Sequence, residues 1–243
     1  MNAIPTLSIS IVSHRSGSLI AQLLGDLSGM AAAFSQIIIT INVPEDESFL
    51  VGFEGLPITV ARNKTPKGFG ENHNQAFRMS TSALFAVVNP DIRLGVSPFA
   101  RLAEAALGAG LGASAPLVLS PAGAIEDSVR RFPTVSRLAV RVLLNRRQPD
   151  YRQTAGANVP VDWAAGMFMV FSRVAFERVG GFDTRYFMYF EDADICRRLW
   201  ASGLSVQLVP GAEVVHNAQR NSHRNAQHLK WHVRSAVRFL IGI

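Results

Sequence analysis

Hydrophobic and polar residues follow two different periods along the first part of the chain. Residues Leu7 to Val12 alternate apolar and small polar side chains, which predicts a strand. The stretch from about Ser18 to Phe34 has helical spacing. Ile37 to Ile41 is an unbroken β-branched run, which is typical of a strand that is covered by helices on both faces.

This alternation of strand and helix continues to about residue 119. Two further strands and two helices are predicted, at Ile58 to Ala61, Leu84 to Val88, Gly70 to Ser80 and Pro98 to Leu107. Strands that alternate with helices indicate an α/β fold with a mainly parallel, Rossmann-like sheet flanked by helices.

The second half of the chain is less regular. A segment rich in Pro, Gly, Arg and Gln carries one predicted helix at Thr134 to Leu144, and strands and helices then resume. The predicted elements there are a strand at Val161 to Phe171, helices at Arg173 to Val179 and Glu191 to Ser202, short strands at Ser205 to Leu208 and Glu213 to His216, and a helix at Ser222 to Leu240. We expect a single domain over 1–243, with a nucleotide-binding half at 1–119, a connector or flap at 120–160, a catalytic half at 161–221 and a C-terminal helix at 222–243.

Composition limits the class of protein. The 243 residues are 48% hydrophobic and 17% charged, enough for one substantial core. The one cysteine, Cys196, excludes an internal disulfide framework and a four-thiolate metal site. No apolar run approaches the roughly 20 residues that span a bilayer, and serines interrupt the first hydrophobic stretch. We therefore expect a cytoplasmic protein.

The formal net charge is +6, and basic residues gather in the middle and near the end of the chain. Nucleic acid, anionic lipid, a phosphorylated substrate or plain solvent could each face such residues. Neither a zinc-finger spacing nor interleaved aromatic and basic residues are present, so nucleic acid is not an expected partner. The terminal helix has three open interpretations: it docks on the body, pairs with another subunit, or contacts the inner membrane surface.

Polar residues follow several predicted strands at the edge where ligands bind in such sheets. The loops expected to converge on one cleft are Ser13 to Arg15, Asn42 to Glu45, Arg62 to Gly70 and Asn89 to Asp91. A carboxylate at the end of a strand, such as Asp91, can hold a hard divalent cation, although Asn-Pro-Asp is also common turn chemistry.

Three carboxylates open the helix that begins at Glu191. They could simply complement the helix dipole. However, Asp192 shares a helical face with apolar residues three, four and seven positions later. We therefore expect Asp192 in a partly apolar pocket that raises its pKa. Asp194 precedes Arg197 and Arg198 by three and four residues, so an ordinary surface ion pair is expected there.

Two other features offer ligand groups. The loop and helix start at 63–74 supply amides and backbone N–H groups, but they match neither a phosphate loop nor G-x-G-x-x-G. His216 ends a short apolar strand and would face the cleft if that strand joins the main sheet. A lone histidine is more often a structural or surface residue.

Taken in order, these strings resemble the family 2 glycosyltransferases of the GT-A fold, and within them the rhamnosyltransferase-like branch. The matching segments are Ser8 to Ser13, Lys67 to Asn74, Asn89 to Asp91, Asp162 to Gly166, Gly180 to Asp183, Phe187 to Asp194 and His216. The resemblance extends from about residue 7 to 216, and residues 180–198 are its most specific part.

The resemblance implies roles for individual residues. Asp91 corresponds to the metal-binding aspartate, with His216 as a second ligand of Mg²⁺ or Mn²⁺, and Asp192 to the catalytic base, with Glu191 beside it. The residues expected to contact the nucleotide sugar are Ser13, His14, Arg15, Asn42, Lys67, Gly68, Asn74, Asn89, Asp91 and Gly166. Trp163, Glu191 and Asp192 are expected at the acceptor. For Trp163, an ordinary place in the hydrophobic core is an equally good interpretation. The chain departs from the family pattern at residues 42–45, where relatives often have Asp-Asn-x-Ser.

The implied reaction is the transfer of a sugar, with inversion, from a nucleoside-diphosphate donor to a saccharide or lipid-linked saccharide acceptor. L-Rhamnose from dTDP-rhamnose, in cell-surface polysaccharide synthesis, is the favoured donor sugar. Two alternatives remain open, a sugar nucleotidyltransferase and a non-catalytic basic binding module. A nucleotidyltransferase would need a glycine-rich basic signature after the first strand, where this chain has only Ser13-His14-Arg15-Ser16-Gly17.

Overall fold

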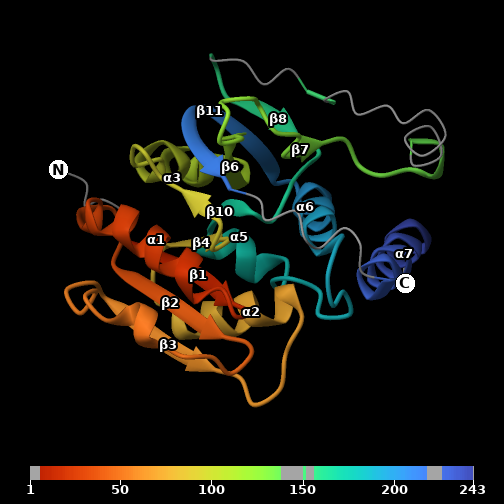
Figure 1. Ribbon diagram of the computed structural model, residues 1–243. Coiled ribbons are helices and arrows are strands. Elements are labelled where there is room, and N and C mark those ends of the chain that lie inside the picture. Colours follow the sequence, from red (N-terminus) through yellow and green to blue (C-terminus); the bar gives the residue numbers. More distant parts are fainter. Residues whose placement is uncertain (1–5, 138–149, 152–155, 218–225, 243) are drawn as a thin grey trace.

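The computed structural model describes residues 6–137, 150–151, 156–217 and 226–242. Its main sheet begins with four parallel strands in the spatial order β3-β2-β1-β4 (Figure 1). These strands are β1 (Leu7–Ser13), β2 (Gln36–Ile41), β3 (Ile58–Arg62) and β4 (Leu84–Val88). Their carboxyl ends therefore share one edge of the sheet, as the sequence predicts.

Strand β10 (Phe168–Ser172) joins the two halves of the sheet. It runs antiparallel to β4 on one side and to β6 (Leu111–Leu119) on the other. Beyond β6 lies the parallel strand β11 (Ser205–His216), whose end pairs with the short β5 (Ile92–Arg93). β8 (Val159–Val161) also pairs with β11, while β7 (Val129–Arg130) and β9 (Trp163–Ala164) form a separate small sheet. β5 thereby carries the chain that follows Asp91 to the end of β11.

Helices cover both faces of the sheet because alternate strand residues point to opposite sides. Leu7, Ile9 and Ile11 of β1 pack with α1 (Gly17–Ser28) and α3 (Phe99–Leu107). The opposite face packs against α2 (Phe69–Met79), α5 (Arg173–Arg178) and α6 (Glu191–Ala201) (Figure 1). Two short 3₁₀ turns, Ala31–Ala33 and Ser48–Leu50, complete the first half.

The last helix, α7 (Ala226–Ile241), lies beside α6 at one side of the molecule (Figure 1). It joins the second face of the core through Phe239, which is 3% exposed. Among the helices that the structure describes, none combines the length and the apolar character required to cross a membrane.

The fold class predicted from the sequence is confirmed, but several element boundaries were wrong. β6 was not expected, because its sequence LGASAPLVL is poor in β-branched residues, and its position between two strands decides its conformation. The region 161–171 is divided among β8, β9 and β10 rather than one strand, and the two short strands after residue 205 are a single strand with a register shift between Val209 and Glu213. Most of the helix expected at 134–144 lies outside the described residues.

Candidate functional site

Glu45 ties together the segments that follow β1 and β2. Its carboxylate accepts hydrogen bonds from the Ser13 hydroxyl and from the backbone N–H groups of Arg15 and Gly17. Arg15 has a left-handed backbone conformation, with φ at 60°. The turn after β1 is therefore fixed in position at the carboxyl edge of the sheet.

Asn42 connects the same edge to the loop that begins at residue 63. Its Oδ1 accepts from the Lys67 backbone N–H at 2.8 Å and from Asn63 Nδ2 at 2.9 Å. Its Nδ2 donates to the Lys67 carbonyl at 3.0 Å and lies 3.3 Å from His14 Nδ1. The structure therefore brings together four residues expected at the nucleotide, from three separate loops: Ser13, His14, Asn42 and Lys67.

Asp91, His216 and Glu126 form a second cluster. His216 Nε2 lies 3.2 Å from Asp91 Oδ2, and His216 Nδ1 lies 2.7 Å from Glu126 Oε2. The pairing of β11 with β5 places them together, and the Asn217 backbone N–H donates to the Asp91 carbonyl at 2.8 Å. Burial by itself disfavours the imidazolium, but hydrogen bonds to Asp91 and Glu126, with their negative charges, raise the pKa of His216 to about 9.

This cluster has the donor types for a divalent cation. Asp91 Oδ1 is buried and has no hydrogen-bond partner among the described residues. The pair of imidazole and carboxylate suits Mn²⁺ or Mg²⁺, and a carboxylate on the far ring nitrogen is the usual partner of a metal-binding histidine. The described residues contain no set of three or more His, Cys, Asp or Glu side chains arranged around one metal position. A cation here would need further oxygen ligands from a substrate or water.

Asp192 occupies the first turn of α6 and is held by two backbone donors. Its Oδ2 accepts from the Gly166 N–H at 3.0 Å, and its Oδ1 accepts from the Ala193 N–H at 2.8 Å. Burial raises the pKa of Asp192, while these two hydrogen bonds and the positive charge of Arg130 oppose the rise. The carboxylate is therefore oriented, and it is more basic than an ordinary aspartate.

Glu191 is the more deeply buried of the two acids, at 5% exposed. Its Oε2 has no hydrogen-bond partner within the described part of the chain. Burial, and then the charge of Asp192, raise the pKa of Glu191 well above its ordinary value. Two adjacent acids thus differ in environment, which favours a proton on Glu191 while Asp192 is ionised.

The chain before these acids is strained. Tyr189 and Phe190 both have positive φ values, 71° and 67°, a conformation that costs roughly 1 to 3 kcal/mol for each such residue. Helix α7 packs against this segment: Tyr189 OH lies 2.8 Å from His228 Nδ1, and the Phe190 ring contacts Phe239. Helix α7 therefore contacts the two strained residues that directly precede Glu191 and Asp192.

The first turn of α6, which bears Asp192, and the turn that bears Asp91 are hydrogen-bonded to two adjacent residues, Gly166 and Met167. Gly166 donates to Asp192, and the carbonyl of the next residue, Met167, accepts from the Asn89 N–H at 2.9 Å. Asn89 belongs to the same turn as Asp91. Gly166 and Met167, the two residues that precede β10, therefore link the first turn of α6 to the turn that bears Asp91, about a hundred positions earlier in the sequence.

Several other expected site residues have structural contacts. Both ends of the Asn74 amide bind the backbone of Phe182. Asn74 Oδ1 accepts from the Phe182 N–H at 2.9 Å, and Asn74 Nδ2 donates to the Phe182 carbonyl at 2.7 Å. A Cβ on Gly68 would lie 2.6 Å from the Phe187 carbonyl oxygen, and one on Gly166 would lie 3.0 Å from the Phe69 ring and 3.6 Å from Asp192 Cβ. Both glycines therefore permit close packing around the acids.

Trp163 is 8% exposed and donates from its indole nitrogen to the Arg131 carbonyl at 3.0 Å. The guanidinium of Arg130 lies over its ring.

For Asp194, the expectation of a surface ion pair was wrong in one respect. Its partners are Arg197 at 3.1 Å and Arg198 at 2.7 Å, but the carboxylate side chain is only 6% exposed. The packing of α6 against the sheet buries it.

Sequence reasoning missed two residues of the site. Glu126 contacts His216, and Arg130 is close enough to Asp192 to affect its pKa. Both belong to a segment without clear periodicity, so only tertiary contacts reveal them. Arg220, His223 and Arg224, the basic residues that follow His216 in the sequence, lie outside the described residues.

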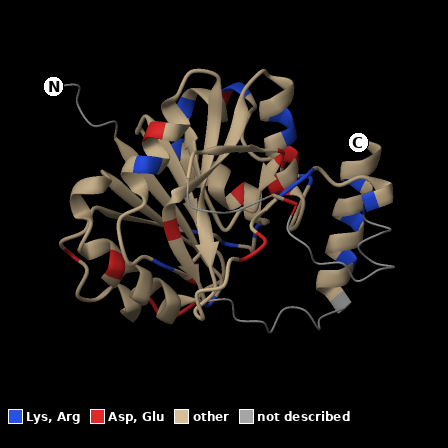
Figure 2. Ribbon diagram, turned by 90° about the horizontal axis from the view of Figure 1, so that it is seen from above, with Lys and Arg blue, Asp and Glu red and all other residues tan. Residues whose placement is uncertain are grey.

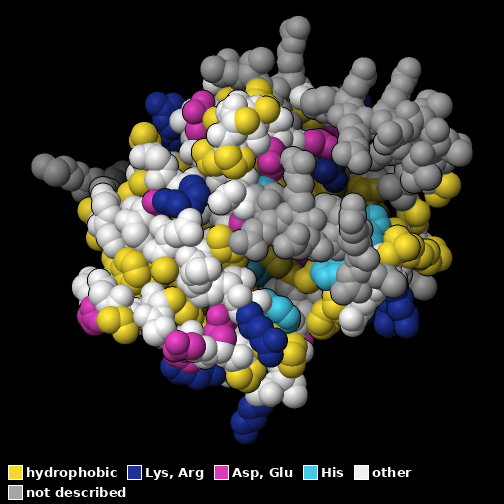
Figure 3. Space-filling model, in the orientation of Figure 1, with side chains coloured by type: hydrophobic (Ala, Val, Ile, Leu, Met, Phe, Trp, Pro, Cys, Tyr) yellow, Lys and Arg dark blue, Asp and Glu magenta, His cyan; other side chains and the backbone are white. Residues whose placement is uncertain are grey.

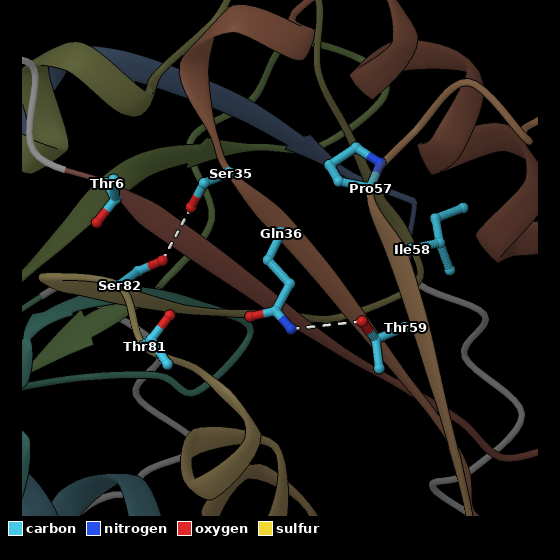
Figure 4. A pocket seen from close by; sticks show the side chains of 8 residues that line it. All are labelled: Thr6, Ser35, Gln36, Pro57, Ile58, Thr59, Thr81 and Ser82. Carbon is cyan, nitrogen blue, oxygen red and sulfur yellow. Dashed lines mark hydrogen bonds between the residues drawn. The ribbon is translucent and has the colours of Figure 1, made fainter.

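An open pocket elsewhere has a different character. It is lined by Thr6, Ser35, Gln36, Pro57, Ile58, Thr59, Thr81 and Ser82 (Figure 4). These residues precede or begin β1 to β4, so the pocket lies at the amino edge of the parallel strands, opposite the polar clusters. Its lining contains no ionisable side chain, and ligands of sheets of this kind bind at the opposite, carboxyl edge.

Comparison with known proteins identifies the family. The family described as "Glycosyl transferase family group 2" matches residues 126–236. The rhamnosyltransferase WbbL of Escherichia coli K12 is 31% identical over 186 residues, which cover 71% of this chain and 70% of WbbL. The chain belongs to the family 2 glycosyltransferases.

Other similarities agree with this family. The N-acetylglucosaminyl-diphospho-decaprenol L-rhamnosyltransferase of Mycobacterium tuberculosis H37Rv is 35% identical over 190 residues, or 74% of this chain. The match spans only 62% of the length of that relative. The crystal structure of GalNAc-T7 with UDP, GalNAc and Mn²⁺ has a TM-score of 0.72 at 14% identity, covering 98% of this chain and 48% of GalNAc-T7. This similarity establishes that the fold is the GT-A fold.

Proposed function

We propose that this protein is an inverting glycosyltransferase that moves a sugar from a nucleoside-diphosphate donor to an acceptor hydroxyl. The observation that carries the proposal is a pair of hydrogen bonds from the two residues just before β10, Gly166 to Asp192 and Asn89 to Met167. This pair sets a burial-activated carboxylate beside the turn that bears Asp91. A base on one side and a phosphate-binding group on the other is the arrangement that sugar transfer requires.

Asp192 is the proposed general base. It accepts the proton of the acceptor hydroxyl as the oxygen attacks the anomeric carbon and the bond to the diphosphate breaks. A raised pKa brings the basicity of Asp192 closer to that needed at neutral pH. A positioned general base contributes roughly 10²- to 10⁴-fold to the rate. The Gly166 N–H keeps the carboxylate aimed, and Glu191, buried beside it, stays protonated and avoids a second buried charge.

Asp91 and His216 are the proposed ligands of Mg²⁺ or Mn²⁺. A bound cation at this position would supply positive charge against the negative charge that develops on the departing diphosphate. Glu126 holds the far nitrogen of His216 and so fixes which nitrogen faces Asp91. His14 and Lys67, which are not buried, are proposed to face the nucleotide, and the buried Asn42 is proposed to hold the Lys67 backbone in place beneath it.

L-Rhamnose from dTDP-rhamnose is the proposed donor sugar, and a saccharide or lipid-linked saccharide of cell-surface polysaccharide synthesis is the proposed acceptor. The support is that relatives at 31% and 35% identity are named rhamnosyltransferases, one of them acting on N-acetylglucosaminyl-diphospho-decaprenol.

The test is a panel of nucleoside-diphosphate sugars, each incubated with the purified protein and a lipid-linked N-acetylglucosaminyl diphosphate. Parallel reactions contain Mn²⁺, Mg²⁺ or a chelator, and the product is analysed by mass spectrometry. We expect transfer from dTDP-rhamnose with a metal and none with Asp192→Asn. Release of pyrophosphate from a sugar 1-phosphate and a nucleoside triphosphate, with no transfer from any donor, would instead support the nucleotidyltransferase alternative.

A further inference from the structure

Helix α7 has two apolar faces, and only one of them contacts the rest of the described structure. The inner face contains Trp231, which packs on Phe187, and Phe239, which packs on Phe190. Ser235 on the same face donates to the Met188 carbonyl at 2.9 Å. These contacts anchor α7 to the segment that leads into Glu191.

The outer face carries five large apolar side chains that remain exposed, between 36% and 66% each. We call them the outer stripe: Leu229, Val233, Val237, Leu240 and Ile241. Leu229, Val233, Val237 and Ile241 are spaced four residues apart, and Leu240 follows Val237 by three, so the five side chains lie along one side of the helix. A contiguous exposed apolar stripe of this kind marks an interaction surface rather than an ordinary solvated face.

Positive charge borders the outer stripe. Lys230 and Arg234 each follow a stripe residue by one position, so they project about 100° around the helix from it. Arg238 continues the same row, with its guanidinium over Tyr186. The helix contains no Asp or Glu. Figure 2 shows basic and no acidic positions along α7, and in Figure 3 hydrophobic side chains gather over this helix with basic side chains near its end.

We propose that α7 is an interfacial helix, whose outer stripe inserts into the surface of an anionic phospholipid bilayer while Lys230 and Arg234 contact the lipid phosphates. An apolar stripe bordered by Lys and Arg is the composition of helices that lie in the plane of a membrane surface. Charge also decides between occupants: two copies paired through this face would bring two rows of positive charge together, whereas an anionic bilayer complements that charge.

The position of α7 gives this contact a consequence for the site. Its inner face holds Phe187 to Phe190, which precede Glu191 and Asp192 directly. Membrane contact would therefore keep the carboxylates at the lipid surface. The membrane contact itself follows from the helix alone, but its use in presenting a lipid-linked acceptor rests on the proposed function.

Vesicle flotation tests the proposal directly. The wild-type protein is mixed with vesicles of phosphatidylcholine alone, or of phosphatidylcholine with phosphatidylglycerol, at low and high salt. We expect it to float with the anionic vesicles, and to do so less at high salt because ion screening weakens the basic contacts. Binding to neutral vesicles should be much weaker.

Variants separate the two contributions. The triple variant Leu229→Gln, Val233→Gln, Leu240→Gln should partition at least about tenfold less, because several buried methylene groups are lost from the lipid contact. Its control replaces Val51, Val96 and Val174 by Gln, since these three are at least 74% exposed and lie outside α7. Lys230→Gln with Arg234→Gln should lose the salt-sensitive part of binding. The control pair Arg78→Gln with Arg178→Gln should not.

Two results would overturn the inference. One is equal flotation of the wild-type protein and the stripe variant. The other is a lipid-free wild-type dimer on size-exclusion chromatography that the stripe variant converts to a monomer, with no vesicle binding by either; this would assign the stripe to a second copy. Transfer to an acceptor dispersed in detergent reports the proposed function separately. Transfer without flotation contradicts only the membrane contact, and flotation without transfer contradicts only the glycosyltransferase.

Discussion

The backbone N–H of Gly166 donates a 3.0 Å hydrogen bond to Asp192 Oδ2. This contact links the entry to a central strand with the first turn of α6. It orients the carboxylate by a rigid group instead of a mobile side chain, which is how a proton acceptor is pre-organised. The carbonyl of the next residue, Met167, accepts a hydrogen bond from the Asn89 N–H and so holds the turn that bears Asp91.

Replacement of Asp192 by Asn should reduce the transfer rate by at least about 100-fold, because the amide cannot accept the acceptor proton. The affinity for the donor should change little, since Asp192 is assigned to the acceptor side. The checks are turnover with saturating donor and the dissociation constant of the nucleoside diphosphate by calorimetry. Turnover near the wild-type rate would remove Asp192 as the base.

The fall in transfer activity at low pH, the acidic limb of the pH profile, should follow the protonation of Asp192. Its pKa is raised above the ordinary 3.8, so activity should fall with decreasing pH earlier than an exposed aspartate would allow. Arg130→Gln removes a positive charge that lowers this pKa, so the limb should move to higher pH. Arg131→Gln is the matched control, because Arg131 is not among the groups that shift the pKa of Asp192. A limb that responds equally to both variants would argue against the assignment.

Glu191→Gln should make the protein relatively more stable as pH rises. The folded-state pKa of Glu191 is well above the ordinary 4.5. The wild-type protein therefore loses folding free energy as pH increases from that ordinary value up to the folded-state pKa. Glutamine has no proton to lose, so the difference in melting temperature between variant and wild type should grow across this window. A constant difference at all pH values would show that Glu191 does not carry a shifted proton.

Glu126→Gln should weaken cation binding by roughly 10- to 100-fold, the usual effect of removing the carboxylate behind a metal-binding histidine. The measurement is the thermal stabilisation of the protein by Mn²⁺ in the presence of a nucleoside diphosphate, titrated with the metal. Asp127→Asn serves as a neighbouring control, because Asp127 pairs with Arg130 instead of His216. If Asp91→Ala also left the Mn²⁺ response unchanged, the proposed metal site would be wrong.

Phe239→Ala should cost about 3 to 5 kcal/mol of folding free energy, as expected for a buried aromatic residue. The ring is 3% exposed and contacts Phe190, Phe132 and the Arg197 guanidinium. Denaturant unfolding measures the loss. Phe239→Leu keeps most of the volume and should cost much less. Because α7 supports the strained Tyr189 and Phe190, the alanine variant should also lose turnover under conditions where it remains folded.

The order of local patterns in the sequence was sufficient for the parallel half of the sheet. Each of β1 to β4 is a short apolar or alternating run, and a helix with its own period follows most of them, so local periodicity and the polar residues after each strand predict a shared edge. The first-turn acids of α6 and the apolar face below Asp192 were readable for the same reason, because side chains three, four and seven residues apart on a helix must share a side.

Tertiary structure alone decided the rest. Asp91 and His216 lie more than a hundred residues apart, and only the pairing of β5 with β11 brings them into contact. Glu126 and Arg130 come from a segment without periodicity, and Asn74 proved to use its amide on Phe182. Local sequence encodes which backbone a residue adopts and which way its side chain faces. Contacts between distant strands depend on how the whole core packs, and no single window of sequence contains that information.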